Sequence, residues 1–360
     1  MRLNRMGRVW MAPACLAATI CIGGYAQAQT DGCNGAEADL KTLNGELNRN
    51  ALADAKSLLA RLQTAHPDCA ALLLANARIL TVEGPPSAAG QAFSQYADRM
   101  PDEATGMAYF ARFLIDQGQY AQADEFSQEA YMRAPESPAA LAVRGQILVL
   151  KGQTAQGREL LEKSCALQPD DAEAEFQLGA VLDRAKRPAE AVTRFAKVVE
   201  LDPNFASAWD YLALNLEPLG KEDQADAAYR HGLDVNHEGP HYDAFLDYNY
   251  GRFLAKRNQL DEAKKHLDRA VVLVPDYRAT WYDRAKLNFR MGNYAQARTD
   301  GERALSITEN TGGILNLQVY VLLEQVYRRL GEKELADKYA KLTRETPPPA
   351  RKDYGDAPQP

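Results

Sequence analysis

The segment FAKVVELDP, Phe195 to Pro203, combines an apolar helical face with a proline that ends it. Apolar residues three and four positions apart share one side of an α-helix, and proline stops a helix because it lacks the backbone N–H. Prolines recur along the chain at one constant interval: Pro67, Pro101, Pro135, Pro169 and Pro203. A fixed period of this length predicts a solenoid of repeated helical units.

The period continues beyond Pro203 with two interruptions. His237 stands one such interval after Pro203, Pro275 follows after a slightly longer one, and Glu309 comes a regular interval further on. The extra residues fall between units, around 239–243 and 310–315. They predict two longer turns and no break in the helical pattern.

Other columns keep the same register when each proline is taken as position 32 of a unit. Glycine is frequent at position 15, where it can take the left-handed backbone that ends a helix. Small residues fill positions 8 and 20, so two helices can pack closely there. The residues concerned are Gly84, Gly118, Gly152, Gly220 and Gly292 at position 15, Ala77, Ala111, Gly145, Gly179, Ala213, Gly251 and Ala285 at position 8, and Ala55, Ala89, Ala123, Ala191, Ala225, Ala263 and Ala297 at position 20.

These columns resemble those of the tetratricopeptide repeat. The resemblance implies an all-α fold, a right-handed superhelical solenoid of antiparallel helix pairs, with about nine repeats of about 34 residues over 29–345. The implied units are 36–69, 70–103, 104–137, 138–171, 172–205, 206–239, 244–277, 278–311 and 317–350.

The two ends of the chain read differently from the repeats. Residues 1–28 have the pattern of a secretory signal peptide: three arginines, a short apolar run and the cleavage motif Ala26-Gln27-Ala28. We therefore expect a periplasmic or secreted protein with no transmembrane segment in the mature chain. Residues 346–360 carry Pro347, Pro348 and Pro349 and are expected to be a disordered tail.

Charge argues against one class of partner. Removing 1–28 leaves 39 basic against 49 acidic residues, a net charge of −10. A surface of this sign repels phosphate backbones, so nucleic acid is not an expected partner. The expected partner is a protein or peptide, and a local basic patch could accept an acidic one.

Three cysteines remain after cleavage at residue 28. Cys33 precedes the first helix of the mature chain and Cys69 opens the first helix of the next repeat, and these two points are neighbours in a stacked array. A Cys33–Cys69 disulfide is therefore plausible in an oxidising compartment, and two free thiols are the alternative. Cys165 falls on a predicted core face and is expected to be a buried thiol.

The resemblance also implies where a partner would bind. In this family, positions 2, 5, 6, 9, 12 and 13 of each first helix line the inner groove. The C-terminal units place aromatic rings and cations there, which suit a peptide with carboxylates. The central unit 138–171 is mostly apolar at these positions, and packing between repeats is the alternative role throughout. The candidate groove residues are Phe245, Tyr248, Asn249, Arg252, Tyr282, Lys286, Phe289, Arg290 and Arg328.

Two known functional patterns fit poorly. The family's carboxylate clamp for chaperone C-termini is incomplete, because Ala279 and Asp283 occupy positions that need cations. His237 to His241 spells HEGPH, a form of the HExxH zinc-protease motif. That motif needs one continuous helix, which glycine and proline oppose, so His237 and His241 are weak metal candidates.

No glycine-rich phosphate loop, nucleophile elbow or Ser/His/Asp set occurs in the sequence. We therefore expect neither catalysis nor a cofactor. The leading hypothesis is an exported scaffold that binds a peptide or protein in its groove. The alternatives are an accessory subunit of an envelope export or assembly complex and, more weakly, a zinc-dependent hydrolase at the HExxH-like insertion.

Overall fold

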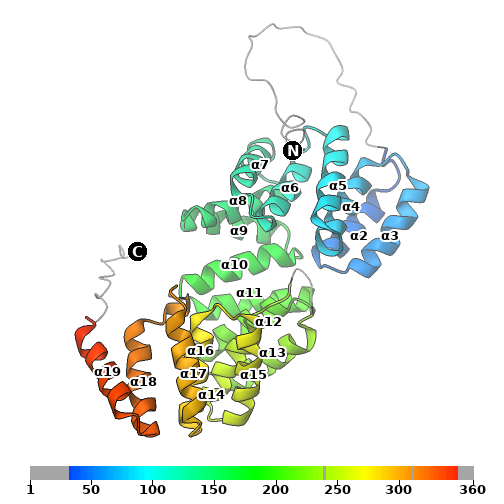
Figure 1. Ribbon diagram of the computed structural model, residues 1–360. Helices are drawn as coiled ribbons and strands as arrows, with labels where there is room; N and C mark the ends of the chain where they lie inside the picture. The colour runs from blue at the N-terminus through cyan, green and yellow to red at the C-terminus, as the bar shows by residue number, and fades with distance from the viewer. Residues whose placement is uncertain (1–31, 238–240, 310, 348–360) are drawn as a thin grey trace, which may run out of the picture. The chain divides into compact units, whose positions relative to one another are not determined.

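The computed structural model describes residues 32–237, 241–309 and 311–347. All regular elements within these ranges are helices, with no strand among them (Figure 1). The predicted all-α fold is therefore confirmed. The chain divides into two compact units, one ending at Tyr242 and the other beginning at Asp243. The proposed signal peptide, and the tail from residue 348 on, lie outside the described residues.

Helical hairpins build both units, and each hairpin packs on the next one within its unit. The N-terminal unit contains α2 (Glu37–Asn48), α3 (Leu52–Ala65), α4 (Ala70–Glu83), α5 (Pro86–Arg99), α6 (Ala104–Asp116), α7 (Tyr120–Arg133), α8 (Pro138–Leu150), α9 (Thr154–Leu167), α10 (Ala172–Arg184), α11 (Pro188–Leu201), α12 (Ala206–Leu216) and α13 (Glu222–Val235). The C-terminal unit contains α14 (Leu246–Lys256), α15 (Leu260–Leu273), α16 (Arg278–Arg290), α17 (Tyr294–Ser306), α18 (Asn316–Leu330) and α19 (Lys333–Glu345). No helix in the described ranges has the length and apolar character needed to cross a bilayer.

The turn inside most hairpins depends on a left-handed residue near repeat position 15. Gly152, for example, has φ +80° between α8 and α9. Lys186 and Asn258 take the same conformation with φ +59° and +61°, although a side chain makes it costly. The turn geometry is therefore imposed by the packing of the two helices and does not require glycine.

Gly84 is an exception to this pattern, and the prediction of a left-handed backbone there is wrong. Its φ is −102° and its ψ is 166°, an extended conformation. The cause is the sequence Pro85-Pro86 that follows, because a residue before proline is driven out of the helical regions. Pro86 then occupies the first turn of α5, where its missing N–H costs nothing.

Helices α8 and α9 cross at very short range. Gly145 and Gly157 face each other there, and a Cβ built on Gly157 would stand 2.6 Å from the carbonyl oxygen of Gly145. The same Cβ would stand 2.6 Å from Cγ2 of Val149. A backbone oxygen cannot move aside without shifting the helix, so this crossing requires glycine.

Gly157→Ala is expected to lower the free energy of unfolding by about 1–3 kcal/mol through overpacking. Alanine also gains up to about 1 kcal/mol in helix propensity, so the steric effect must exceed this gain. Gly45→Ala is the matched control, since its Cβ would meet no atom closer than 3.9 Å. The control should be neutral or stabilising in thermal unfolding. Equal effects of the two substitutions would contradict the close crossing.

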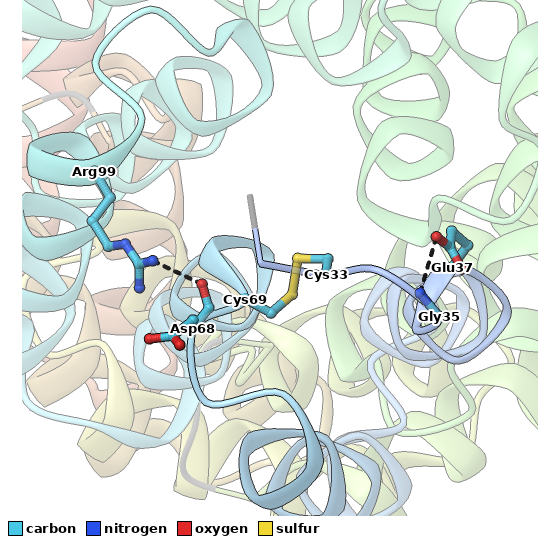
Figure 2. The surroundings of a disulfide bond; sticks show 6 residues. All are labelled: Cys33, Gly35, Glu37, Asp68, Cys69 and Arg99. Atoms are coloured by element: carbon cyan, nitrogen blue, oxygen red, sulfur yellow. Dashed lines mark hydrogen bonds between the residues drawn. A yellow bond between two sulfur atoms is a disulfide. The ribbon is translucent and has the colours of Figure 1, made fainter. Parts of the chain in front are cut away.

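A disulfide closes the N-terminal end of the array. Cys33 and Cys69 are bonded with their Cα atoms 4.5 Å apart, and both are buried (Figure 2). Cys33 precedes α2, and Cys69 is the residue before α4. Arg99 of α5 donates to the Asp68 carbonyl oxygen at 2.7 Å, which ties the same turn to the next helix (Figure 2). The disulfide thus joins the start of the first hairpin to the start of the second.

Candidate functional site

Residues of α14, α16 and the segments just before these two helices form an aromatic and charged cluster in the C-terminal unit. We call Phe245, Tyr248, Arg252, Tyr277, Asp283 and Lys286 the C-terminal cluster. The Tyr277 ring meets two others edge to face, with centroids 5.0 Å from Phe245 and 5.4 Å from Tyr248. Phe245 is 40% exposed, so the cluster presents an apolar ring to solvent.

Asp283 organises the charges of the cluster. Its Oδ2 accepts a hydrogen bond from the Tyr248 hydroxyl at 2.9 Å and lies 3.7 Å from Nε of Arg252. Its Oδ1 lies 3.7 Å from Nζ of Lys286. Burial raises the pKa of the Tyr248 hydroxyl, and the neighbouring Asp283 carboxylate raises it further. Tyr248 therefore stays a neutral donor, and two cations face one carboxylate.

The remaining predicted groove residues lie apart from this carboxylate or have structural contacts. Arg290 donates to the Ala255 carbonyl oxygen at 2.8 Å and to Oδ1 of Asn258 at 3.0 Å, so it caps the turn of the preceding repeat. Phe289 packs against Tyr294 with ring centroids 5.5 Å apart. Arg328 pairs with Glu324 at 2.7 Å along α18.

Asn249 and Tyr282 lie closer to the C-terminal cluster. Asn249 is buried one turn into α14, and its N–H donates to the Phe245 carbonyl oxygen at 2.9 Å. The Tyr282 ring has Nζ of Lys286 5.3 Å from its centroid, a cation–π contact. Of the predicted residues, Phe245, Tyr248, Arg252, Tyr282 and Lys286 are thus brought together.

His237 and His241 lie outside the helices. Helix α13 ends at Val235 and α14 begins at Leu246, and residues 238–240 are outside the described ranges. The His241 ring stacks on Phe205 with centroids 3.7 Å apart. No group of three potential metal ligands occurs among the residues that the structure covers. The single-helix placement required by the HExxH motif is therefore absent from the described ranges.

The N-terminal unit has a cavity of about 550 Å³, which we call the N-terminal cavity. Its walls come from the turn between α2 and α3, from α4, α6 and α10, and from the connection between α11 and α12. One wall is closed by a contact across 152 residues, where Nδ2 of Asn50 donates to Oδ2 of Asp202 at 3.0 Å. The side chains that define its chemistry are Arg78, Tyr109, Arg112, Phe113, Asp116, Glu173 and Phe176.

The two arginines of the N-terminal cavity have partners within the protein. Nη2 of Arg78 donates to Oδ1 of Asn48 at 2.8 Å, and its guanidinium lies 4.0 Å from the centroid of the Tyr109 ring. Nη2 of Arg112 lies 3.7 Å from Oδ2 of the buried Asp171. Both guanidinium groups therefore already contact polar, aromatic or charged side chains of the cavity wall.

Asp116 differs from these arginines. Within the described part of the chain, no hydrogen bond or ion pair reaches its carboxylate. Desolvation by the cavity walls raises the pKa of Asp116 to about 7, although the residue stays exposed to the cavity. The nearby Glu173 carboxylate adds to the rise, and the Arg112 guanidinium partly opposes it. The surroundings of Asp116 thus disfavour its ionised form.

Sequence reasoning missed the N-terminal cavity, although the signal was present. Arg78, Arg112 and Asp116 occupy inner positions 9, 9 and 13 of their units, and Glu173 and Phe176 occupy positions 2 and 5. The same position rule that selected the C-terminal residues therefore also selects these. They were not selected because unit 138–171, which lies between them in the sequence, is mostly apolar at its inner positions.

Comparison with known sequences agrees with the repeat geometry. The family model of the tetratricopeptide repeat matches residues 151–208 and 248–312. A tetratricopeptide repeat-containing protein of Rhizobium etli is 42% identical over 67 residues, which cover 19% of this chain and 32% of that protein. The matched segment thus spans about a third of its relative.

Two solved structures contain helical repeats similar to those of this chain. A chain of the APC/C hetero-tetramer Cut9–Hcn1 superposes with a TM-score of 0.65 at 14% identity, covering 81% of this chain and 57% of that one. A tetratricopeptide repeat protein from Parabacteroides merdae gives a TM-score of 0.47 at 18% identity, covering 67% of this chain and 92% of that one. The matched family model and the hairpins of both units thus show that the chain contains tetratricopeptide repeats.

Proposed function

We propose that this protein is an exported scaffold that binds an extended segment of a partner protein at its C-terminal cluster. The tetratricopeptide fold is a scaffold for interactions between proteins, and the cluster is where the inner positions of two consecutive repeats converge. The observation that carries the proposal is a half-exposed aromatic ring beside a pair of cations. Phe245 packs on Tyr277, which contacts Tyr248. Tyr248, Arg252 and Lys286 all lie at the Asp283 carboxylate. Aromatic rings beside cations are typical of binding hot spots.

The charge of the C-terminal cluster favours an acidic segment. Arg252 and Lys286 each lie 3.7 Å from a carboxylate oxygen of Asp283, so two cationic groups stand side by side. A carboxylate from a partner could accept hydrogen bonds from both, and charge-assisted hydrogen bonds to guanidinium and ammonium groups are the strong ones. Phe245 would cover an apolar side chain of the same segment.

Export is supported by two separate features of the sequence and structure. Residues 1–28 carry the basic, apolar and cleavage regions of a secretory signal. Disulfides such as Cys33–Cys69 persist in oxidising compartments and are rare in the cytosol. N-terminal sequencing of the protein recovered from the periplasm or medium should begin at Gln29; recovery of Met1 from the cytoplasm would contradict export.

The binding proposal can be tested with heptapeptides selected by phage display on the wild-type protein. Peptides with Asp or Glu next to an apolar residue should lose about tenfold or more in affinity for Arg252→Glu/Lys286→Glu, because two attractive contacts become repulsive. Lys333→Glu/Arg344→Glu makes the same change in net charge on exposed positions of α19 and should bind them normally. Equal binding by both variants would exclude the C-terminal cluster as the site.

A further inference from the structure

We propose that the N-terminal cavity is a second binding site, which takes a lysine or arginine side chain from an extended segment of a partner protein. The cationic group would lie between Asp116 at the end of α6 and Glu173 in the first turn of α10. This site is separate from the C-terminal cluster. It takes a cationic side chain, whereas the C-terminal cluster takes a carboxylate.

The charge inventory of the N-terminal cavity supports a cationic occupant. Its walls contain four carboxylates against two guanidinium groups, together with one histidine: Asp116, Asp171, Glu173, Asp202, Arg78, Arg112 and His241. Asp171 caps α10 by accepting the Ala174 N–H at 3.0 Å, and Asp202 accepts Asn50. Glu173 accepts a hydrogen bond from Nε2 of Gln177 at 2.7 Å. Asp171 pairs with Arg112 and Asp202 with His241, so Asp116 and Glu173 are the wall carboxylates that form no ion pair among the described residues.

The position of Asp116 in its helix also favours a cationic occupant. It is the last residue of α6, where the helix dipole is negative and a carboxylate is disfavoured. Glu173 adds a second negative charge nearby, and both effects oppose ionisation of Asp116, while the Arg112 guanidinium offsets part of them. A bound ammonium or guanidinium group would offset both, since opposite charges in a partly enclosed site attract more strongly than in water.

Size and wall chemistry restrict the occupant to an extended segment. A volume of about 550 Å³ accommodates a few side chains and no folded domain. Phe113 and Phe176 supply apolar surface beside the carboxylates. The methylene stem of a lysine or arginine, or an adjacent apolar residue, can lie against these rings while the charged head meets Asp116.

The test uses the full mature protein and a heptapeptide phage library. Peptides recovered through this site should contain Lys or Arg beside an apolar residue. They should bind Asp116→Asn/Glu173→Gln about tenfold or more weakly in fluorescence anisotropy, and replacing the basic residue by Gln should cause a similar loss. Affinity for the wild type should also increase several-fold from pH 6 to pH 8, because Asp116 loses its proton as the pH rises through about 7.

Several results would overturn the proposal: a selection that returns no basic peptides, basic peptides that bind the double variant as well as the wild type, or affinity that falls with rising pH. Asp116→Asn should keep or raise the melting temperature at pH 8, which shows that a loss of binding is not a loss of fold. Arg252→Glu/Lys286→Glu should still bind the basic peptides. Failure of this site and failure of the C-terminal cluster are thus observed separately.

Discussion

Asp300→Ala should destabilise the C-terminal unit by about 3–5 kcal/mol, because the nearly buried Arg284 guanidinium loses its buried counter-charge and keeps only the exposed Asp268 carboxylate. Asp300 is fully buried in α17 and accepts two hydrogen bonds from Arg284, at 3.0 Å from Nε and 2.6 Å from Nη2. It also accepts hydrogen bonds from Nδ2 of Asn288 at 3.0 Å and from Nε2 of Gln296 at 2.9 Å. Thermal unfolding and hydrogen exchange of α16 and α17 would measure the loss.

Asp268→Ala provides the matched control for Asp300→Ala. Asp268 also contacts Arg284, at 3.1 Å from Nη1, but its side chain is 41% exposed. Removing this partner should therefore cost less than about 1 kcal/mol. Replacing both partners with apolar residues, as in Arg284→Met/Asp300→Leu, should recover part of the stability lost in Asp300→Ala. A similar cost for the two aspartates would show that burial does not decide the effect.

Removing the disulfide should destabilise the first hairpin by about 3–4 kcal/mol, the loop-closure value for its 36-residue separation. Cys33→Ser/Cys69→Ser should raise hydrogen exchange in α2 and α3 and leave that of α8 and α9 nearly unchanged. Chemical reduction of the wild type should have the same effect. Both outcomes follow because the bond restricts the unfolded chain mainly between its two ends.

Cys165→Ala is the control for the disulfide variant, because it removes a buried sulfur atom that takes no part in a disulfide. Cys165 is a free, buried cysteine in α9, and burial raises the pKa of its thiol. This variant should respond to reductant just as the wild type does. If reduction left α2 and α3 as protected as before, the disulfide would have no measurable part in holding the N-terminal hairpin.

The fold could be predicted because its determinants are local. Prolines after most second helices and small residues such as Ala191 and Ala263, both fully buried, mark the hairpins within a single repeat. The error at Gly84 was local too: the glycine column suggested a left-handed turn, and the following proline prevented it. Lys186 and Asn258 show the converse, since packing imposes that turn without glycine.

The candidate sites were less predictable, because they depend on contacts between repeats. Repeat position alone placed Arg290 in the groove, but its side chain caps the turn around Asn258 in the preceding repeat. The N-terminal cavity requires residues from several repeats to face one space, and its wall includes a contact between Asn50 and Asp202. A periodic pattern gives each residue's place within its own unit, and it does not give the curvature that brings distant units together.

The contact between Asn50 and Asp202 changes how the N-terminal unit should respond to stress. Solenoids usually behave as a row of elements in which each hairpin is coupled only to its immediate neighbours. Here the first hairpin also touches the connection after the fifth, so fraying at the chain's beginning would be felt far along the sequence. The first hairpin is thus coupled to a distant connection as well as to its neighbour, and its loss would also open the N-terminal cavity.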